Sequence, residues 1–262
     1  MHISNHVKSN YWQFDASTFN GAERKLSQFI LPHLHSNSTV CDFGGGAGLI
    51  NLELSPFVRS ITCINPSSNL VSAFDRQIYA RSLTNIRTQN ADLKQITGIW
   101  DTILLFFRGG AQSIPRYLYN ANDQIIMATY NDQTENPDWQ TSRINKFANT
   151  SNTQIILDTL NIQYELTCLT LDFSQPFSDF DDARQYAAVH NPSMNKTAIE
   201  HYLRNTLECT HDRIFPYYLP IQHKIGLFFI KKNRNPQIIS LNQPLHFANY
   251  HQNRYYKKEI FD

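Results

Sequence analysis

A cluster of glycines directly after a short apolar segment constrains this chain more than any other feature. Residues 39–43 read Thr-Val-Cys-Asp-Phe, which is typical of a buried β-strand, and Gly44, Gly45, Gly46 and Gly48 follow at once. Glycine at 44 and 46 permits a tight turn with backbone dihedrals that other residues avoid, and it lets a ligand approach the backbone closely. The segment therefore predicts a strand, a ligand-binding glycine turn and the start of a helix.

Two classes of ligand suit such a turn, and the spacing of the glycines distinguishes them. A dinucleotide site has the pattern Gly-x-Gly-x-x-Gly, with the pyrophosphate at the helix N-terminus. Counted from Gly44, the third glycine of that pattern would stand at position 49, which is Leu49. The carboxylate of Asp42 beside the turn also suits an ammonium group better than a pyrophosphate. The pattern favours a cationic ligand, and a glycine turn that binds no ligand is the remaining alternative.

Strand-like and helix-like segments alternate along most of the chain. Strand patterns occupy residues 39–43, 60–64, 85–89, 100–107, 124–130, 162–173 and 221–230, and the clearest helix patterns are 49–54, 67–79, 153–160, 180–189 and 197–207. Continuous apolar strands separated by helices indicate a parallel sheet that is covered on both faces. We predict an α/β fold: a doubly wound, mostly parallel seven-stranded sheet with helices on both faces. An antiparallel edge strand and a small helical cap inserted before the last strand complete the expected fold.

Composition excludes several classes of function. A net charge of +1 and the absence of a long basic run argue against nucleic-acid binding. The four cysteines lack the spacing of a zinc site or a disulfide framework, so we expect no metal. We find no signal peptide and no apolar run of membrane-spanning length. We therefore expect a cytoplasmic protein, a monomer or homodimer, with a small-molecule partner and no membrane or nucleic-acid partner.

The ordered segments resemble the class I, Rossmann-like S-adenosylmethionine-dependent methyltransferases, and in particular their bacterial small-molecule branch. The resemblance rests on residues 39–48, on Ile64-Asn65-Pro66-Ser67, on Asn90-Ala91-Asp92-Leu93 and on residues 100–105, and it covers about residues 11–230. It implies S-adenosylmethionine as the cofactor.

The resemblance also implies a role for individual positions. Asp42 and the carbonyls near Gly44 would hold the methionine amino group, and the glycines that follow would leave room for the methionine and the ribose. Pro66 would lie against the adenine, Asp92 would accept a hydrogen bond from the adenine amino group, and the amide of Leu93 would complete that contact. Phe107 would lie near the sulfonium. The implied cofactor site therefore consists of Asp42, Gly44, Gly45, Gly46, Gly48, Asn65, Pro66, Asp92, Leu93 and Phe107.

Asn65 departs from the family pattern. The resembling proteins carry a carboxylate here that grips both ribose hydroxyls, whereas an amide lacks the charge and the second acceptor oxygen. A neutral acceptor contributes roughly 1 kcal/mol less than a charged one, so we expect weaker cofactor binding. On this reasoning Asn65→Asp should keep or tighten binding.

The resemblance and the strand pattern together predict five parts of the chain. Residues 1–36 form a helical, aromatic segment over the cofactor site, and residues 37–174 form the Rossmann-like core that binds the cofactor. Residues 175–220 form the cap, residues 221–232 the last core strand, and residues 233–262 an irregular tail.

Aromatic residues at the mouth of the expected site are candidates for substrate binding. They are Tyr11, Trp12, Tyr130, Phe177 and Tyr217, and ordinary packing is the alternative for each of them. His190 and His211 flank the second cap helix, and either could be a base or a solvated loop residue. The catalytic residues stay unassigned, because methyl transfer mainly needs orientation and the exclusion of water.

We expect a methyltransferase that transfers a methyl group to a small-molecule acceptor by in-line displacement. The alternative is a protein that binds S-adenosylmethionine without methyl transfer, as a sensor, a scaffold or a degenerate enzyme. Asn65 and the missing base favour that alternative. A nicotinamide-dependent oxidoreductase is disfavoured by Leu49.

Overall fold

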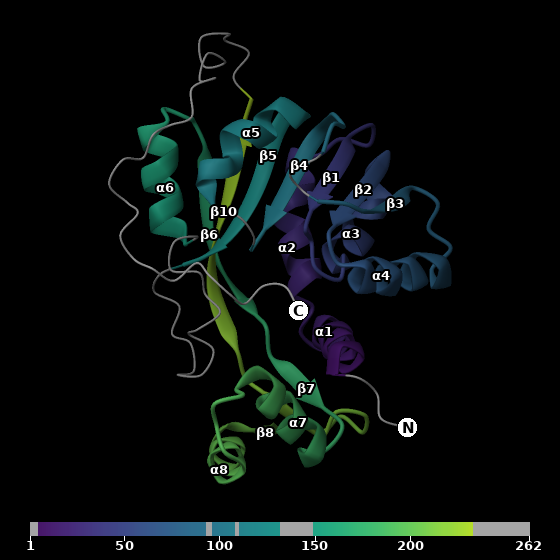
Figure 1. The fold of residues 1–262 in the computed structure, drawn as a ribbon, viewed down its shortest axis with the longest axis vertical. Helices are drawn as coiled ribbons and strands as arrows, with labels where there is room; N and C mark the ends of the chain where they lie inside the picture. The colour runs from purple at the N-terminus through teal and green to yellow at the C-terminus, as the bar shows by residue number, and fades with distance from the viewer. Residues whose placement is uncertain (1–4, 93–95, 108–109, 132–148, 233–262) are drawn as a thin grey trace. The chain divides into compact units, whose positions relative to one another are not determined.

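A seven-stranded sheet forms the centre of the computed structural model, which describes residues 5–92, 96–107, 110–131 and 149–232 (Figure 1). The strand order is β3-β2-β1-β4-β5-β10-β6, and all strands are parallel except β10. The strands are β1 (Thr39–Phe43), β2 (Ser60–Asn65), β3 (Ile86–Asn90), β4 (Trp100–Phe106), β5 (Ala121–Tyr130), β6 (Glu165–Asp172) and β10 (Gln222–Lys231). The predicted α/β fold is confirmed.

Helices cover both faces of this sheet, because the central strands are apolar on both sides. On one face the apolar sides of α2 (Ala22–Ile30), α3 (Leu49–Leu54) and α4 (Ser68–Ala80) pack against β1, β2 and β4. On the other face lie α5 (Ile114–Asn120) and α6 (Thr150–Thr159). Short 3₁₀ turns occupy Leu31–His33, Ser55–Phe57 and Ala111–Ser113. Two hydrophobic cores therefore sandwich the sheet, as its continuous apolar strands require.

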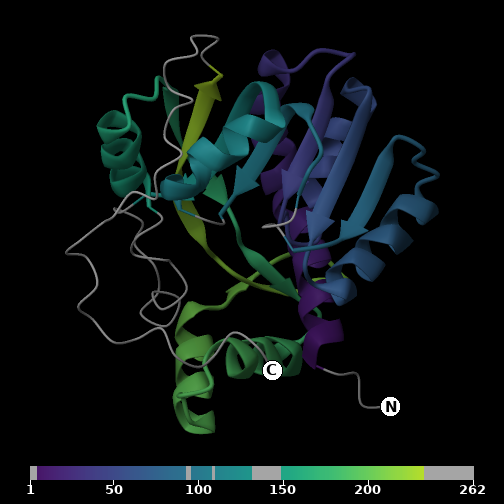
Figure 2. The ribbon, with the colours of Figure 1, turned by 45° about the horizontal axis from the view of Figure 1, so that its top comes forward.

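The antiparallel strand lies inside the sheet and not at its edge, which corrects the predicted position. β10 pairs with β5 on one side and β6 on the other, and Figure 2 shows it running against the parallel strands. The run from Ile225 to Ile230 is buried at every position, so its backbone needs partners on both sides. In β6 only Leu171 is buried, and Glu165, Cys168 and Thr170 are exposed, which suits an edge strand.

The inserted segment, residues 175–220, contains a small sheet as well as the two expected helices. The helices are α7 (Phe180–His190) and α8 (Lys196–Thr206), and the sheet has the antiparallel order β7-β9-β8. Its strands are β7 (Gln175–Phe177), β8 (Glu208–Cys209) and β9 (Tyr217–Leu219). The helices lie beyond the carboxyl ends of the parallel strands (Figure 2). The cap is therefore mixed in structure and not purely helical.

The N-terminal helix α1 (Asn5–Asn20) is tied to the cap through Trp12. This side chain is 4% exposed and packs into the hydrophobic core of the cap, with Phe177 and Leu203 among its neighbours. Its indole Nε1 donates to Asp182 Oδ1 at 2.9 Å, and its carbonyl accepts from Gln175 Nε2 at 3.1 Å. A segment far from the cap in sequence thus completes the core of the cap.

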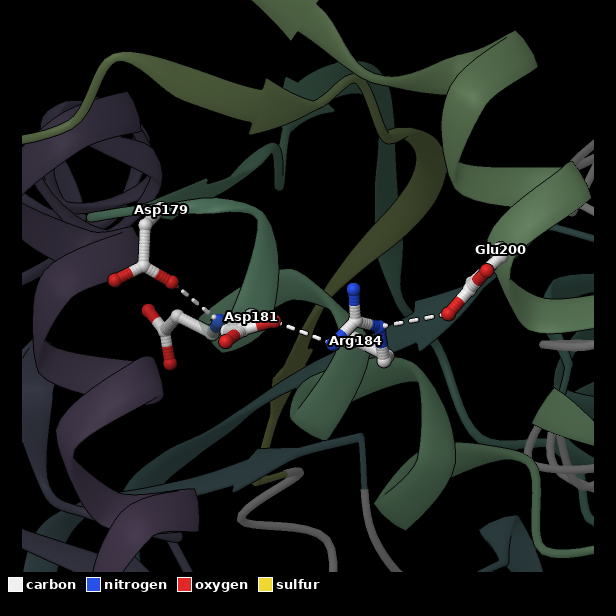
Figure 3. Close-up of polar contacts among 5 residues, drawn as sticks. Asp179, Asp181, Arg184 and Glu200 are labelled. Carbon is white, nitrogen blue, oxygen red and sulfur yellow. Dashed lines mark hydrogen bonds and ion pairs between the residues drawn. The ribbon is translucent and has the colours of Figure 1, made fainter.

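Charged residues join the two cap helices to each other (Figure 3). Arg184 on α7 binds Asp181 one turn earlier, and its Nε lies 3.3 Å from Glu200 Oε1 on α8. Asp179 caps α7 by accepting from the backbone nitrogen of Asp182 at 2.8 Å. The guanidinium also lies 5.4 Å from the centre of the Phe180 ring. Because the acidic partners are partly exposed, we assign these contacts a minor share of the stability of the cap.

The described part of the chain contains neither a helix that could span a membrane nor a cluster of metal ligands. None of its helices combines the length and the apolar character needed to cross a membrane. Within the same residues, no three acidic, histidine or cysteine side chains converge as metal ligands would. The predicted irregular tail, residues 233–262, lies outside the described residues.

Candidate active site

The glycine turn between β1 and α3 has the backbone that its sequence predicts. Gly44, Gly46 and Gly48 have φ values of 73°, 56° and 73°, in the left-handed region that favours glycine. The amide of Gly44 donates to the carbonyl of Ile64 on β2 at 2.7 Å, so the turn is fixed to the neighbouring strand. The turn therefore presents a fixed backbone at the carboxyl edge of the sheet.

Asp42 lies beneath this turn, fully buried, and not on its outer surface. Its carboxylate accepts a hydrogen bond from Asn51 Nδ2 on α3. A Cβ atom on Gly45 would lie 1.7 Å from Asp42 Oδ2, so the carboxylate is in close contact with the turn backbone. In this structure Asp42 and Asn51 together brace the turn against the helix that follows it.

Asn51 is a site residue that sequence reasoning missed, although a signal was present. It is buried between Ile50 and Leu54 in a short helix whose inward face is otherwise apolar. A buried polar residue on such a face generally needs a hydrogen-bond partner, and the only acidic residue in the preceding strand is Asp42.

Asn65 joins two turns at the end of β2. Its Nδ2 donates to the carbonyl of Gly46 at 3.4 Å, and its Oδ1 accepts from the amide of Ser67 at 2.9 Å. The side chain is 5% exposed. An aspartate could make the second contact but not the first, because a carboxylate has no donor. The amide therefore has a structural use in this chain that the family carboxylate would not serve.

The expectation that Asn65→Asp keeps or tightens ligand binding stays a prediction, and this geometry adds an expected effect of the same change on stability. The change removes the donor to the Gly46 carbonyl and places a carboxylate oxygen beside that carbonyl oxygen. We expect the variant to lose about 1–2 kcal/mol of unfolding free energy, measured by urea denaturation followed by circular dichroism. Asn65→Ser, which keeps a small donor and acceptor, should lose less. An aspartate variant as stable as the wild type would show that the contact to Gly46 contributes nothing.

The largest cavity that involves the turn has a volume of about 390 Å³, which is in the usual range for a small-molecule site. It lies between α1 and α2 on one side and the carboxyl ends of β1, β4 and β6 on the other, where β10 begins. Residues of the turn form its floor, and Gln175 and Tyr186 of the cap reach it. This is the position at which open parallel sheets bind ligands.

Four rings form a closed cluster in the wall of this cavity, which we call the aromatic cluster: Phe107, Tyr130, Phe173 and His223. Phe107 stacks on Tyr130 with ring centres 4.6 Å apart and meets Phe173 edge-on at 6.0 Å. The His223 ring lies 5.0 Å from Tyr130 and 5.2 Å from Phe173. Phe107, Phe173 and His223 line the cavity. The ends of β4, β5 and β6 and the start of β10 thus contribute one ring each.

Phe107 has an unusual backbone conformation. Its φ is 54°, a conformation that costs a bulky residue about 1–3 kcal/mol and persists only where the surroundings enforce it. The amide of Phe107 donates to the carbonyl of Ala128 on β5 at 2.9 Å, which fixes this conformation. Strained residues of this kind concentrate at functional sites, so the conformation supports a role for the cavity.

Solved structures share this architecture, although neither a family profile nor a curated protein matches the sequence. A protein assigned as a methyltransferase from Bacillus halodurans C-125 has a TM-score of 0.52 at 12% identity, over 81% of this chain and 99% of its own. A SAM-dependent methyltransferase from Aquifex aeolicus has a TM-score of 0.51 at 11% identity, over 87% and 99%. This chain has the class I methyltransferase fold. The cyclase SpnF shares it, with a TM-score of 0.51 at 14% identity over 79% and 80%.

Within the class I methyltransferase fold, the predicted cofactor residues fall into three groups. Gly44, Gly45, Gly46 and Phe107 line the large cavity. Asp42, Gly48 and Asn65 surround a much smaller space on the other side of the turn, which Gly45 and Gly46 also line. Pro66 and Asp92 are exposed at the ends of β2 and β3, and Leu93 lies outside the described residues.

The five aromatic substrate candidates are dispersed by the same fold. Tyr11 is 60% exposed on α1, whereas Trp12, Phe177 and Tyr217 pack in or against the core of the cap. Tyr130 belongs to the aromatic cluster. None of the five is among the described residues that line the cavity.

The two histidine candidates for a base also lie away from the cavity lining. His190 stacks on Tyr186 with ring centres 3.9 Å apart, and its Nδ1 lies 2.8 Å from the Tyr186 carbonyl. His211 is exposed. The histidine that does line the cavity is His223, which alternates with Ile221 and Ile225 on the inward side of β10. That alternation was the sequence signal for it, since a polar residue on an inward strand face is unusual.

Glu23 on α2 is a second titratable residue in the cavity that was not predicted. Burial raises the pKa of its carboxyl, the Ser17 hydroxyl lowers it by hydrogen bonding, and the neighbouring carboxylate of Glu53 raises it. Its Oε2 is buried and has no hydrogen-bond partner among the described residues. A buried acceptor that makes no hydrogen bond costs free energy. The position is therefore suited to a ligand that donates hydrogen bonds or carries positive charge.

Burial lowers the pKa of His223 to about 4, from an ordinary value of 6.5. The folded protein therefore keeps the ring neutral, while the unfolded chain takes up a proton as the pH falls below 6.5. The contribution of the neutral His223 ring to the unfolding free energy is complete above pH 6.5 and is lost as the pH falls from 6.5 to 4. We expect the unfolding free energy of the wild type to fall by about 3 kcal/mol more than that of His223→Gln across this window, in urea denaturation at a series of pH values. Parallel pH dependence of the two proteins would contradict a buried neutral ring.

Proposed function

We propose that this protein binds S-adenosylmethionine at the glycine turn and transfers its methyl group to a small molecule in the 390 Å³ cavity. The observation that carries the proposal is the position of the turn. In the class I methyltransferase fold it lines a cavity at the carboxyl edge of the sheet, and an acidic side chain, Glu23, lines the same cavity. Two solved structures with this fold and TM-scores above 0.5 are described as methyltransferases.

Glu23 gives the proposed cofactor site a carboxylate that faces the cavity. S-adenosylmethionine carries an ammonium group, and the buried, unpartnered Oε2 of Glu23 is an acceptor of matching charge. We assign Glu23 the role of holding that ammonium from the α2 side, with the carbonyls of the turn on the other side. Asp42, which is fully buried and bound to Asn51, would act through the shape of the turn.

The bound cofactor supplies an activated methyl group on a sulfonium, so the protein itself must orient the acceptor and keep water out. The cavity is suited to both tasks. The cap and α1 contribute Tyr186, Gln175 and Ala16 to its walls, while Phe107 and Phe173 provide apolar surface. A cavity of this size, lined by three parts of the chain, supports a small acceptor and not a polymer.

The same observations bear on the partners and the compartment. A net charge of +1 supports the absence of a nucleic-acid partner. The cysteines are free thiols, two buried and two exposed, which supports a reducing cytoplasm.

A second candidate function is ligand binding without methyl transfer. Its support is Asn65, which stands where the resembling proteins carry a carboxylate. SpnF, which has this fold and is described as a cyclase, shows in addition that the fold alone does not fix the reaction. Incubation with labelled S-adenosylmethionine and a metabolite extract separates the two functions. Labelled product supports transfer, whereas tight binding without product in any extract supports the binder.

The role of Glu23 can be tested by isothermal titration calorimetry with S-adenosylmethionine. We expect Glu23→Gln to weaken binding about 10- to 100-fold, because the variant loses a charge-assisted hydrogen bond worth about 1.5–3 kcal/mol. Glu165→Gln is the matched control and should leave the affinity within about twofold, since Glu165 is exposed at the start of β6 and does not line the cavity. Equal affinities for the wild type and Glu23→Gln would remove Glu23 from the cofactor site.

A further inference from the structure

The residues that line the cavity come from elements of different chemistry. Glu23 lies on α2, near Glu53 of α3, whereas the aromatic cluster lies at the ends of β4 to β6 and the start of β10. No lysine or arginine is among the described residues that line the cavity. The aromatic cluster therefore offers flat apolar surfaces and no countercharge for a phosphate or carboxylate.

His223 is the one polar group within the aromatic cluster that also lines the cavity. The residue is 8% exposed, and its Nδ1 is buried without a hydrogen-bond partner among the described residues. The titratable side chain in contact with the ring is Tyr130, and Glu23 and Tyr186 are the other titratable groups that line the cavity. A buried imidazole among aromatic rings can accept a proton or a hydrogen bond from a bound molecule.

We propose that the cavity binds a planar aromatic alcohol, a phenol, beside the aromatic cluster, and that His223 accepts the hydroxyl proton as the oxygen is methylated. This inference rests on the proposed function, which supplies the methyl donor. The geometry behind it is the placement of His223 beside Phe107 and Phe173 in one wall.

Methyl transfer to the phenol exchanges one bond of the methyl carbon for another. The phenol oxygen forms a bond to the methyl carbon while the bond from that carbon to sulfur breaks, and the sulfur keeps the electron pair. The hydroxyl proton passes to a ring nitrogen of His223, which becomes an imidazolium. The products are an aryl methyl ether and a neutral thioether, and the imidazolium releases its proton to water.

The basicity of His223 favours a phenol over an aliphatic alcohol. Burial lowers the pKa of the ring to about 4, so it is a weak base that is neutral at physiological pH. A weak base assists proton transfer best when the donor is acidic, and a phenol hydroxyl is far more acidic than that of an alcohol. The apolar rings would also stack on the face of a planar acceptor.

The test uses a series of ring-substituted phenols as acceptors with the full-length protein. The series runs from phenols that are neutral at the assay pH to nitrophenols that are already ionised. Initial rates of methyl transfer from labelled S-adenosylmethionine are measured for the wild type, His223→Gln and the control His201→Gln, whose histidine is exposed on α8. Calorimetric binding of S-adenosylmethionine to each protein is measured alongside.

We expect His223→Gln to lower kcat by about 10- to 100-fold for neutral phenols, a modest effect because the ring is a weak base, and by less than about 5-fold for ionised phenols, which need no base. His201→Gln should match the wild type. An equal loss for both kinds of phenol, or no loss, overturns the role of His223. Normal cofactor binding without methylation of any phenol overturns the acceptor class while the proposed function stands. Absence of cofactor binding by the wild type is a failure of the proposed function itself.

Discussion

Gly45→Ala is expected to destabilise the protein by about 2–4 kcal/mol and to abolish detectable binding of S-adenosylmethionine. The added methyl carbon would lie 1.7 Å from Asp42 Oδ2 and 2.3 Å from Asp42 Cγ, far inside contact distance. Asp42 is fully buried, so its carboxylate cannot move aside without leaving Asn51 or displacing the turn. Circular dichroism in urea measures the first effect and calorimetry the second.

A neighbouring glycine and a double variant identify the cause of this loss. Gly46→Ala meets no atom within 4 Å, so it should cost only the strain of a left-handed φ, about 1–2 kcal/mol. Asp42→Gly removes the carboxylate that the new methyl group would meet. In that background Gly45→Ala should cost much less than it does in the wild type. Additive losses in the double variant would contradict the proposed collision with Asp42.

Trp12→Ala is expected to destabilise the cap by about 3–5 kcal/mol, the usual loss for a buried aromatic residue. The side chain is 4% exposed in the core of the cap, and its removal leaves a cavity beside Tyr186, whose ring centre lies 5.2 Å away. It also removes the hydrogen bond from the indole to Asp182. Because Tyr186 lines the ligand cavity, we expect ligand binding to weaken as well.

Tyr11→Ala is the matched control, since this adjacent aromatic residue is 60% exposed. It should change the unfolding free energy by no more than about 0.5 kcal/mol. Hydrogen exchange of the α7 and α8 amides is the direct measurement, and Trp12→Ala should accelerate it while β1 and β4 remain protected. Unchanged exchange in α7 would show that α1 does not support the cap.

The sheet and its turn could be predicted because their signals are local. The run Thr39–Phe43 is buried from Val40 onward, and the following glycines adopt the left-handed dihedrals that their pattern implied. The central strands were also predictable, since apolar residues on both faces have no other stable location than a covered parallel sheet.

The position of β10 and the small sheet of the cap were less predictable. An apolar strand pattern shows that Ile225–Ile230 is buried but not which strands flank it, because pairing depends on distant segments. The strand β8 is two residues long, and it forms only because Glu208 and Cys209 meet β9 after the chain has folded back.

The polar residues of the cavity were missed for a related reason. Glu23 stands beside Arg24 and Lys25 in sequence, a pattern typical of a solvated helix face, yet Glu23 lines the cavity while its two neighbours are exposed. The role of Asn65 depends on the Gly46 carbonyl 19 positions away, which no local pattern indicates. The ligand contact that the resemblance implies at Asn65 stays a prediction, and the structure adds a hydrogen bond that joins two turns.

Calorimetric titration of the wild-type protein with S-adenosylmethionine, and separately with NADH, tests the central claim most directly. We predict saturable binding of one S-adenosylmethionine per chain, because Glu23 faces the cavity. We predict no saturable binding of NADH, because Leu49 replaces the third glycine of the dinucleotide pattern. Saturable binding of NADH with none of S-adenosylmethionine would contradict the central claim.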